Sequence, residues 1–121
     1  MTRLLPILLL STAAPAGELS PRLAGEMADI IWKIEGGHAA RKPFGVLSVK
    51  VLDAQHAREI TIASIHANWR RWERAGRPGT FAQFMAHRWV PRSVDAAGHR
   101  RWVSNFNHHL RRVNLRAAAT P

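Results

Sequence analysis

The sequence predicts a small all-α domain with a short irregular or β-like segment after its first helix. Four stretches of the 121 residues carry apolar side chains at helical spacing. A capping residue, Ser20, Asp53 or Thr80, precedes three of these stretches. The chain contains five Trp, four Phe and no cysteine. Packing, and not disulfide bonds, must therefore stabilise the fold.

Residues 1–16 have the pattern of a secretory signal peptide. A positive residue, Arg3, precedes an apolar run from Leu4 to Ala14, and Ala14-Pro15-Ala16 has the small side chains that signal peptidase accepts. Cleavage there leaves residues 17–121, enough for one domain. We expect a periplasmic or secreted protein; an uncleaved anchor is the alternative, although the run is short for a membrane span.

The charge of the chain favours anionic partners. There are 18 Lys and Arg against 8 Asp and Glu, a formal charge of +10. Such a charge attracts nucleic acid, anionic lipid or the anionic polymers of a bacterial envelope. If the protein is exported, the envelope polymers are the favoured partners among these three. The lack of cysteine excludes Cys-based catalysis and Cys-ligated zinc.

The first helix is expected to begin after the cap Ser20, with Pro21 at its first position. Its apolar face comprises Leu23, Met27, Ile30, Ile31 and Ile34, and Gly36 or Gly37 supplies a left-handed cap at its end. The least regular stretch follows, over residues 38–53. Val46, Val49 and Val51 favour extended backbone there, so a short strand or a functional loop is expected.

The second helix should run from the cap Asp53 to about Arg74, where Gly76 and Pro78 end it. Its predicted core stripe is Ile62, Ile65, Trp69 and Trp72.

Thr80 and Gln83 form a capping box for a third helix, which carries Phe81, Phe84, Met85 and Trp89 on one face and ends at Pro91. The fourth helix is expected from about Gly98, with a frayed tail over residues 116–121. Its apolar residues at helical spacing are Trp102, Val103, Phe106, Leu110 and Val113.

Glu35 is the leading candidate for a catalytic residue. It ends an apolar helix and is followed by two glycines. A carboxylate at a helix C-terminus faces the negative end of the helix dipole, which is unfavourable without a reason. A carboxyl group held rigidly in a half-dry setting keeps its proton near neutral pH and suits general-acid cleavage of a glycosidic bond. The alternative is a glutamate that simply faces water.

Two segments together resemble the lysozyme-like superfamily, in particular lytic transglycosylases. Glu35-Gly36-Gly37 is followed, after residues 38–44, by Gly45-Val46-Leu47-Ser48. In that family a helix ends with Glu and Ser or Gly, and a loop leads to Gly-Leu-Met-Gln or a relative of it. The resemblance implies a lysozyme-like catalytic domain over residues 17–121 that cleaves peptidoglycan glycan strands. Ser48 replaces Gln, Gly36 replaces the commoner Ser, and the chain has no Tyr.

The same resemblance implies that Glu35 protonates the glycosidic oxygen and then accepts the proton of the muramyl hydroxymethyl group. It also implies that Gly45 and Ser48 lie beside the sugar. His38, next to the glycine pair, and Asn105, near Trp102, are further candidates for substrate binding.

A second carboxylate would make the enzyme a hydrolase. Asp53 and Glu59 are the candidates, although a helix cap and a solvated face residue are the simpler interpretations. No metal or cofactor is expected, because the histidines do not show a metal-ligand spacing.

Two other functions stay open. One is a non-catalytic basic module that binds the wall or another polyanion. The other is nucleic-acid binding by an intracellular protein, through clustered arginines at 70, 71 and 74, at 100 and 101, and at 111 and 112.

Overall fold

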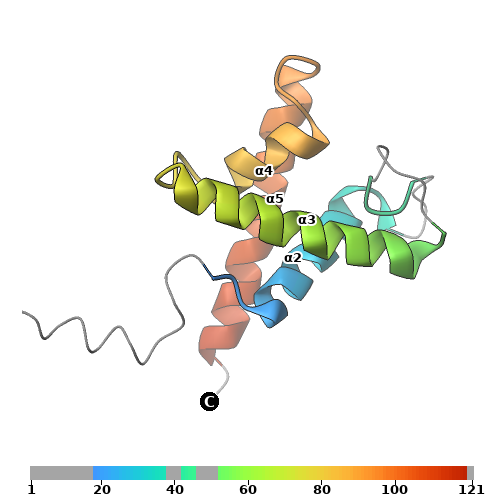
Figure 1. Cartoon of the computed structure of the whole chain (residues 1–121), viewed down its shortest axis with the longest axis vertical. Helices are drawn as coiled ribbons and strands as arrows, with labels where there is room; N and C mark the ends of the chain where they lie inside the picture. Colours follow the sequence, from blue (N-terminus) through green and yellow to red (C-terminus); the bar gives the residue numbers. More distant parts are fainter. Residues whose placement is uncertain (1–17, 38–41, 46–51, 120–121) are drawn as a thin grey trace, which may run out of the picture.

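The computed structural model describes residues 18–37, 42–45 and 52–119, and within this part the chain is all-α. Its elements are α2 (Pro21–Ile34), the 3-10 turn η2 (Pro43–Gly45), α3 (Ala54–Arg74), α4 (Phe81–Trp89) and α5 (Ala96–Ala119) (Figure 1). The described residues include no strand, and the β-like stretch expected at residues 46–51 lies outside them. The all-α prediction is confirmed.

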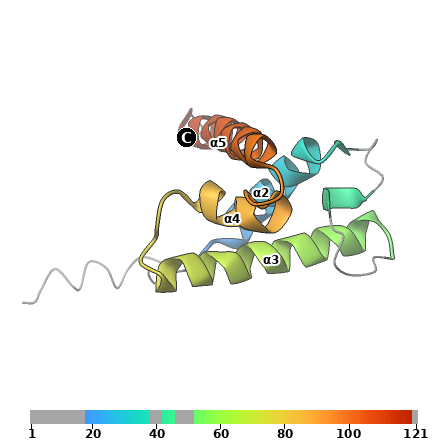
Figure 2. The same ribbon diagram turned by 90° about the horizontal axis from the view of Figure 1, so that it is seen from above.

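The helices form three layers. In Figure 2, α3 lies on one side, α5 on the other, and α2 and α4 lie between them. Contacts agree with this view, because α2 and α4 each pack against both α3 and α5. The core lies where the layers meet, and Met27, Ile31, Ile65, Met85 and Phe106 are fully buried there.

The three predicted caps are confirmed. Ser20 Oγ accepts the N–H of Leu23 at 3.1 Å, and Asp53 Oδ1 accepts the N–H of His56 at 2.8 Å. The capping box of α4 is complete, since Thr80 Oγ1 accepts the N–H of Gln83 at 3.1 Å while Gln83 Oε1 accepts the N–H of Thr80 at 2.9 Å. Each bond satisfies a backbone donor that the helix leaves unpaired.

The boundaries of the last helix differ from the prediction. α5 begins at Ala96, two residues before Gly98, because Asp95 Oδ1 accepts the Gly98 N–H at 2.8 Å and caps the helix. Its backbone stays helical to Ala119, so fraying from Arg116 was wrong.

The buried face of α3 is only partly the predicted one. Ile65 and Trp72 are buried, as expected, but Ile62 and Trp69 are half-buried. Thr61 and Asn68 take their place in the core. Both satisfy their polar groups within the helix: Thr61 Oγ1 donates to the Ala57 carbonyl at 2.8 Å, and Asn68 Nδ2 donates to the Ser64 carbonyl at 2.9 Å. Burial of these side chains therefore leaves no unpaired hydrogen-bonding group.

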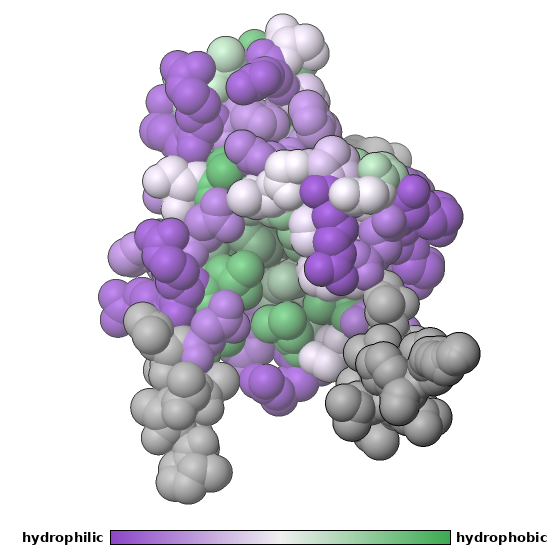
Figure 3. All heavy atoms as spheres, turned by 90° about the vertical axis from the view of Figure 1, so that its left-hand side faces the viewer, coloured by the Kyte–Doolittle hydropathy of each residue, from purple (hydrophilic) through white to green (hydrophobic). Residues whose placement is uncertain are grey.

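No helix in the described part of the chain is both long and apolar enough to cross a membrane. On the face in Figure 3, apolar side chains gather in a hollow that polar side chains surround.

Candidate active site

Glu35 lies at the end of α2, where the helix holds it firmly. Its backbone N–H donates to the Ile31 carbonyl at 2.9 Å, and Ile30 and Ile31 are buried in the core one turn before it. Gly36 and Gly37 follow with positive φ angles of 109° and 59°, so both supply the left-handed backbone expected after this helix. The Glu35 side chain is half-buried.

Gly45 packs directly on the Glu35 carboxyl group. Gly45 has a φ of 65°, and a Cβ atom at this position would lie 2.5 Å from Glu35 Oε1 and 2.8 Å from its Cδ. The turn is closed by the Gly45 N–H, which donates to the Lys42 carbonyl at 2.8 Å. The structure therefore brings together two of the predicted site residues, Glu35 and Gly45, and only glycine allows this approach.

Trp102 holds the other oxygen of the same carboxyl group. Its indole Nε1 donates to Glu35 Oε2 at 3.0 Å, although the two residues are 67 positions apart. Trp102 is 3% exposed, so its ring cannot serve as a platform for a sugar. The core role expected for Trp102 is confirmed, but its contact with Glu35 was missed.

Trp89 connects α4 to the turn that carries Gly45. Its ring stacks on Trp102 with centroids 5.9 Å apart and an interplanar angle of 19°. Its Nε1 donates to the Phe44 carbonyl at 2.8 Å. Phe44 is buried and has a φ of 59°, an uncommon conformation for a residue with a side chain. Trp102 therefore holds the Glu35 carboxyl group, and Trp89 holds the turn that packs against it.

Burial raises the pKa of Glu35, and the hydrogen bond from Trp102 acts against this by lowering it. Burial raises the pKa because it disfavours the charged form, and it is the larger of the two effects. The pKa of Glu35 therefore lies above its ordinary value of 4.5. Its position predisposes it to hold a proton, as a general acid must.

The indole also determines where that proton lies. An indole N–H only donates, so Oε2 must accept in either protonation state. The proton of the neutral acid is then on Oε1, the oxygen beside Gly45.

The other predicted site residues are not assembled with Glu35. His38 and Ser48 lie outside the described residues. Asn105 is exposed on α5, one turn after Trp102, and no hydrogen bond joins it to Glu35 among the described residues.

The candidates for a second carboxylate have other roles. Asp53 caps α3, and Glu59 is exposed and accepts a hydrogen bond from Gln55 Nε2 at 3.4 Å. Within the described residues, no three His, Asp or Glu side chains gather closely enough to hold a metal ion.

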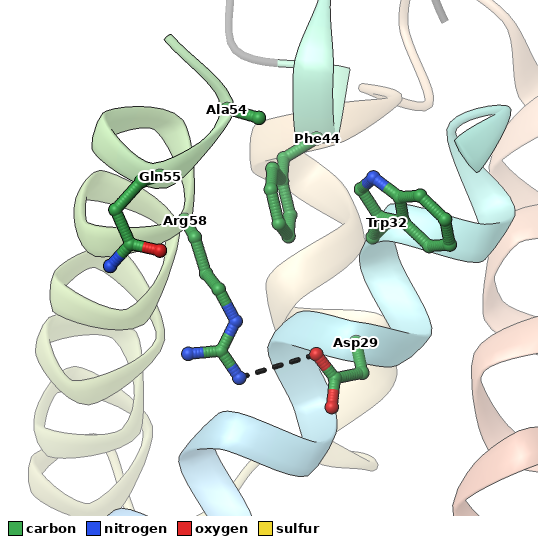
Figure 4. Close-up of a pocket in the computed structure, with 6 residues that line it drawn as sticks. All are labelled: Asp29, Trp32, Phe44, Ala54, Gln55 and Arg58. Atoms are coloured by element: carbon green, nitrogen blue, oxygen red, sulfur yellow. Dashed lines mark hydrogen bonds and ion pairs between the residues drawn. The ribbon is translucent and has the colours of Figure 1, made fainter. Parts of the chain in front are cut away.

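A pocket of about 310 Å³ lies between α2, α3 and η2 (Figure 4). Arg58 crosses it to form an ion pair with Asp29 at 3.2 Å, and the rings of Phe44 and Trp32 face it from the other side. Glu35 does not line this pocket, but Phe44 is adjacent in the chain to Gly45. The turn Pro43–Gly45 therefore contacts the pocket with one residue and the Glu35 carboxyl group with the next.

No protein-family model, curated protein or solved structure matches this chain.

Proposed function

We propose that this chain is an exported lytic transglycosylase that cleaves the glycan strands of peptidoglycan, with Glu35 as general acid and general base. The observation that supports this proposal is the enclosure of one half-buried carboxyl group between Gly45 and Trp102. The enclosure fixes the geometry of the acid, and burial raises its pKa.

The first step is proton transfer from Glu35 Oε1 to the glycosidic oxygen. The bond between this oxygen and the muramyl C1 breaks, and the leaving sugar departs with the proton as a free hydroxyl group. Positive charge develops on the ring, and the carboxylate left behind is stabilised by the Trp102 N–H. Gly45 has no side chain to block the approach to Oε1.

In the second step the carboxylate accepts the proton of the muramyl C6 hydroxyl group while that oxygen attacks C1. An anhydro ring forms, no water is consumed, and Glu35 regains its proton. One carboxyl group is enough for this cycle, which fits a site where Asp53 and Glu59 are engaged elsewhere. A hydrolase would need a second group to activate water.

The test compares the wild-type chain with Glu35→Gln on purified peptidoglycan. The amide oxygen can still accept from Trp102, so we expect the variant to fold and to lose release of glycan fragments. Glu59→Gln is the matched control, because it changes an exposed acid in the same way and should keep full activity. Equal release by wild type and Glu35→Gln would refute the proposal.

Analysis of the product ends separates the two reaction classes. Anhydro ends support the transglycosylase, whereas reducing ends show hydrolysis and would require a second catalytic group.

A further inference from the structure

The charge of this protein is divided unevenly along the chain. All eight acidic residues lie between Glu18 and Asp95, and the chain from Ala96 onwards contains five arginines and no acid. This last stretch is almost entirely α5 (Ala96–Ala119). A single helix therefore carries a strong excess of positive charge.

α5 has two different faces. His99, Trp102, Phe106 and Val113 are buried against the rest of the protein. The opposite side is exposed, and we call it the α5 cationic face: Arg100, Arg101, Asn105, His108, Arg111 and Arg112.

Among the described residues, no salt bridge involves a residue of this face. The two salt bridges among the described residues join Arg58 to Asp29 and Arg77 to Glu73, both away from α5. The positive field also reaches a neighbouring side chain, since the pKa of His109 is lowered by burial first and then by the charges of His108, Lys33 and Arg112. The four arginines thus remain available for an external anion.

We propose that the α5 cationic face binds a flexible polyol-phosphate polymer of the bacterial envelope, lying along the helix axis. The guanidinium group matches the oxygens of a phosphate by its planar fork. Asn105 and His108 lie between the two arginine pairs and offer further donors to phosphate oxygens.

The spacing of the arginines requires a polymer. Arg100 and Arg111 are eleven positions apart, which on an α-helix is about 16 Å. A small anion reaches one arginine pair only, whereas a chain of phosphodiesters reaches both.

The composition of the face argues against the other polyanions. It has no Trp, Tyr or Phe side chain on which a nucleic-acid base could stack. The large apolar side chains that are most exposed among the described residues, Leu52 and Val94, lie off α5, so the described side chains of this helix offer none of that kind for entry into a membrane.

This binding does not depend on the proposed catalysis. It uses the outer side of the helix whose inner side holds Glu35 through Trp102. Its effect would be to retain the protein in the wall while the carboxyl group stays accessible.

The experiment measures binding of poly(glycerol phosphate), in chains long enough to span both arginine pairs, by titration of tryptophan fluorescence. The test variant carries four substitutions to glutamine, at Arg100, Arg101, Arg111 and Arg112. The matched control carries four at exposed arginines elsewhere, Arg22, Arg70, Arg74 and Arg92. Both lose the same net charge, so their difference reports the location of the charge.

We expect the test variant to lose more than about tenfold in affinity, and the salt slope to fall by about 3 for four lost contacts to a single chain. The control should change by less than about threefold. Circular dichroism checks that both remain helical, and peptidoglycan release should be unchanged in both, which separates this proposal from the catalytic one.

Three results would overturn the proposal. Equal losses in the two variants would show a general charge effect with no defined face. Tighter binding of duplex DNA, dependent on the same four arginines, would assign the face to nucleic acid. Equally tight binding of polyglutamate would show that phosphate is not what the face recognises.

Discussion

Substitution of Gly45 tests the geometry on which the active-site argument depends. In Gly45→Ala the new Cβ would lie 2.5 Å from Glu35 Oε1, about 0.9 Å short of ordinary contact. The carboxyl group or the turn must move by that amount, which strains the 3.0 Å hydrogen bond to Trp102. Displacement of a reacting group by about 1 Å can lower a rate by about 100-fold.

The cost in stability can be divided into two parts. A side chain at a φ of 65° costs about 1–2 kcal/mol because the left-handed backbone is disfavoured. Overpacking against the carboxyl group adds about 1–3 kcal/mol. We therefore expect urea unfolding, monitored by tryptophan fluorescence, to show a loss in the free energy of unfolding equal to the sum of these two parts.

Gly76→Ala is the matched control for this substitution. Gly76 has a φ of 85°, and a Cβ atom there would meet nothing within 4 Å. It should lose only the backbone part, about 1–2 kcal/mol, and keep full peptidoglycan release. If Gly45→Ala loses no more stability than Gly76→Ala and stays active, the carboxyl group does not lie where the argument needs it.

Three further predictions concern the same cluster. Glu35→Gln should be more stable than wild type near neutral pH, because the folded pKa of Glu35 is raised above its ordinary value of 4.5. The stability that the neutral acid contributes is complete below pH 4.5 and is lost as pH rises through the folded pKa, so unfolding curves of the two chains should converge in acid. Trp102→Phe removes the N–H that lowers this pKa, so carbon NMR of the Glu35 carboxyl group should show a still higher pKa; an unchanged titration would contradict the bond. Trp89→Phe keeps the stacked ring but removes the bond to the Phe44 carbonyl, and should lower the free energy of unfolding by about 1 kcal/mol in urea titration. No loss would show that this bond does not hold the turn.

The helices could be predicted from the sequence because their signals are local. The caps Ser20, Asp53 and Thr80 each bond to a backbone N–H three residues later, so the pattern is visible in four consecutive letters. Asp95 caps α5 by the same rule, and its distance from Gly98 was an available signal that the prediction did not use.

The core of α3 was harder to predict because hydropathy underestimates the burial of polar side chains that hydrogen-bond to carbonyl groups of their own helix. Thr61 and Asn68 bond to carbonyl groups four residues earlier, so they enter the core without an unpaired donor. Ile62 and Trp69 are more hydrophobic but lie partly outside the face that meets the neighbouring helices. The packing angle of the helices, which no local pattern encodes, decides between these sets.

The candidate site likewise has one part that could be predicted from the sequence and one part that could not. The resemblance implied that Glu35 and Gly45 both belong to the site, and the structure places the two residues in contact. The bond from Trp102 depends on how α5 crosses the end of α2 and spans 67 positions. Periodicity marked Trp102 only as a core residue, since a ring at helical spacing carries no information about where its N–H points.

A purely structural role does not explain why position 35 is an acid. The Trp102 N–H needs an acceptor, and the amide oxygen of a glutamine would supply one without charge. The carboxylate instead meets two unfavourable conditions: burial raises its pKa, and the end of α2 presents the negative pole of the helix. No salt bridge to Glu35 offsets them among the described residues. Such a local cost in stability is expected where a residue performs chemistry. Glu35→Gln should therefore be more stable than the wild-type chain and should have no activity.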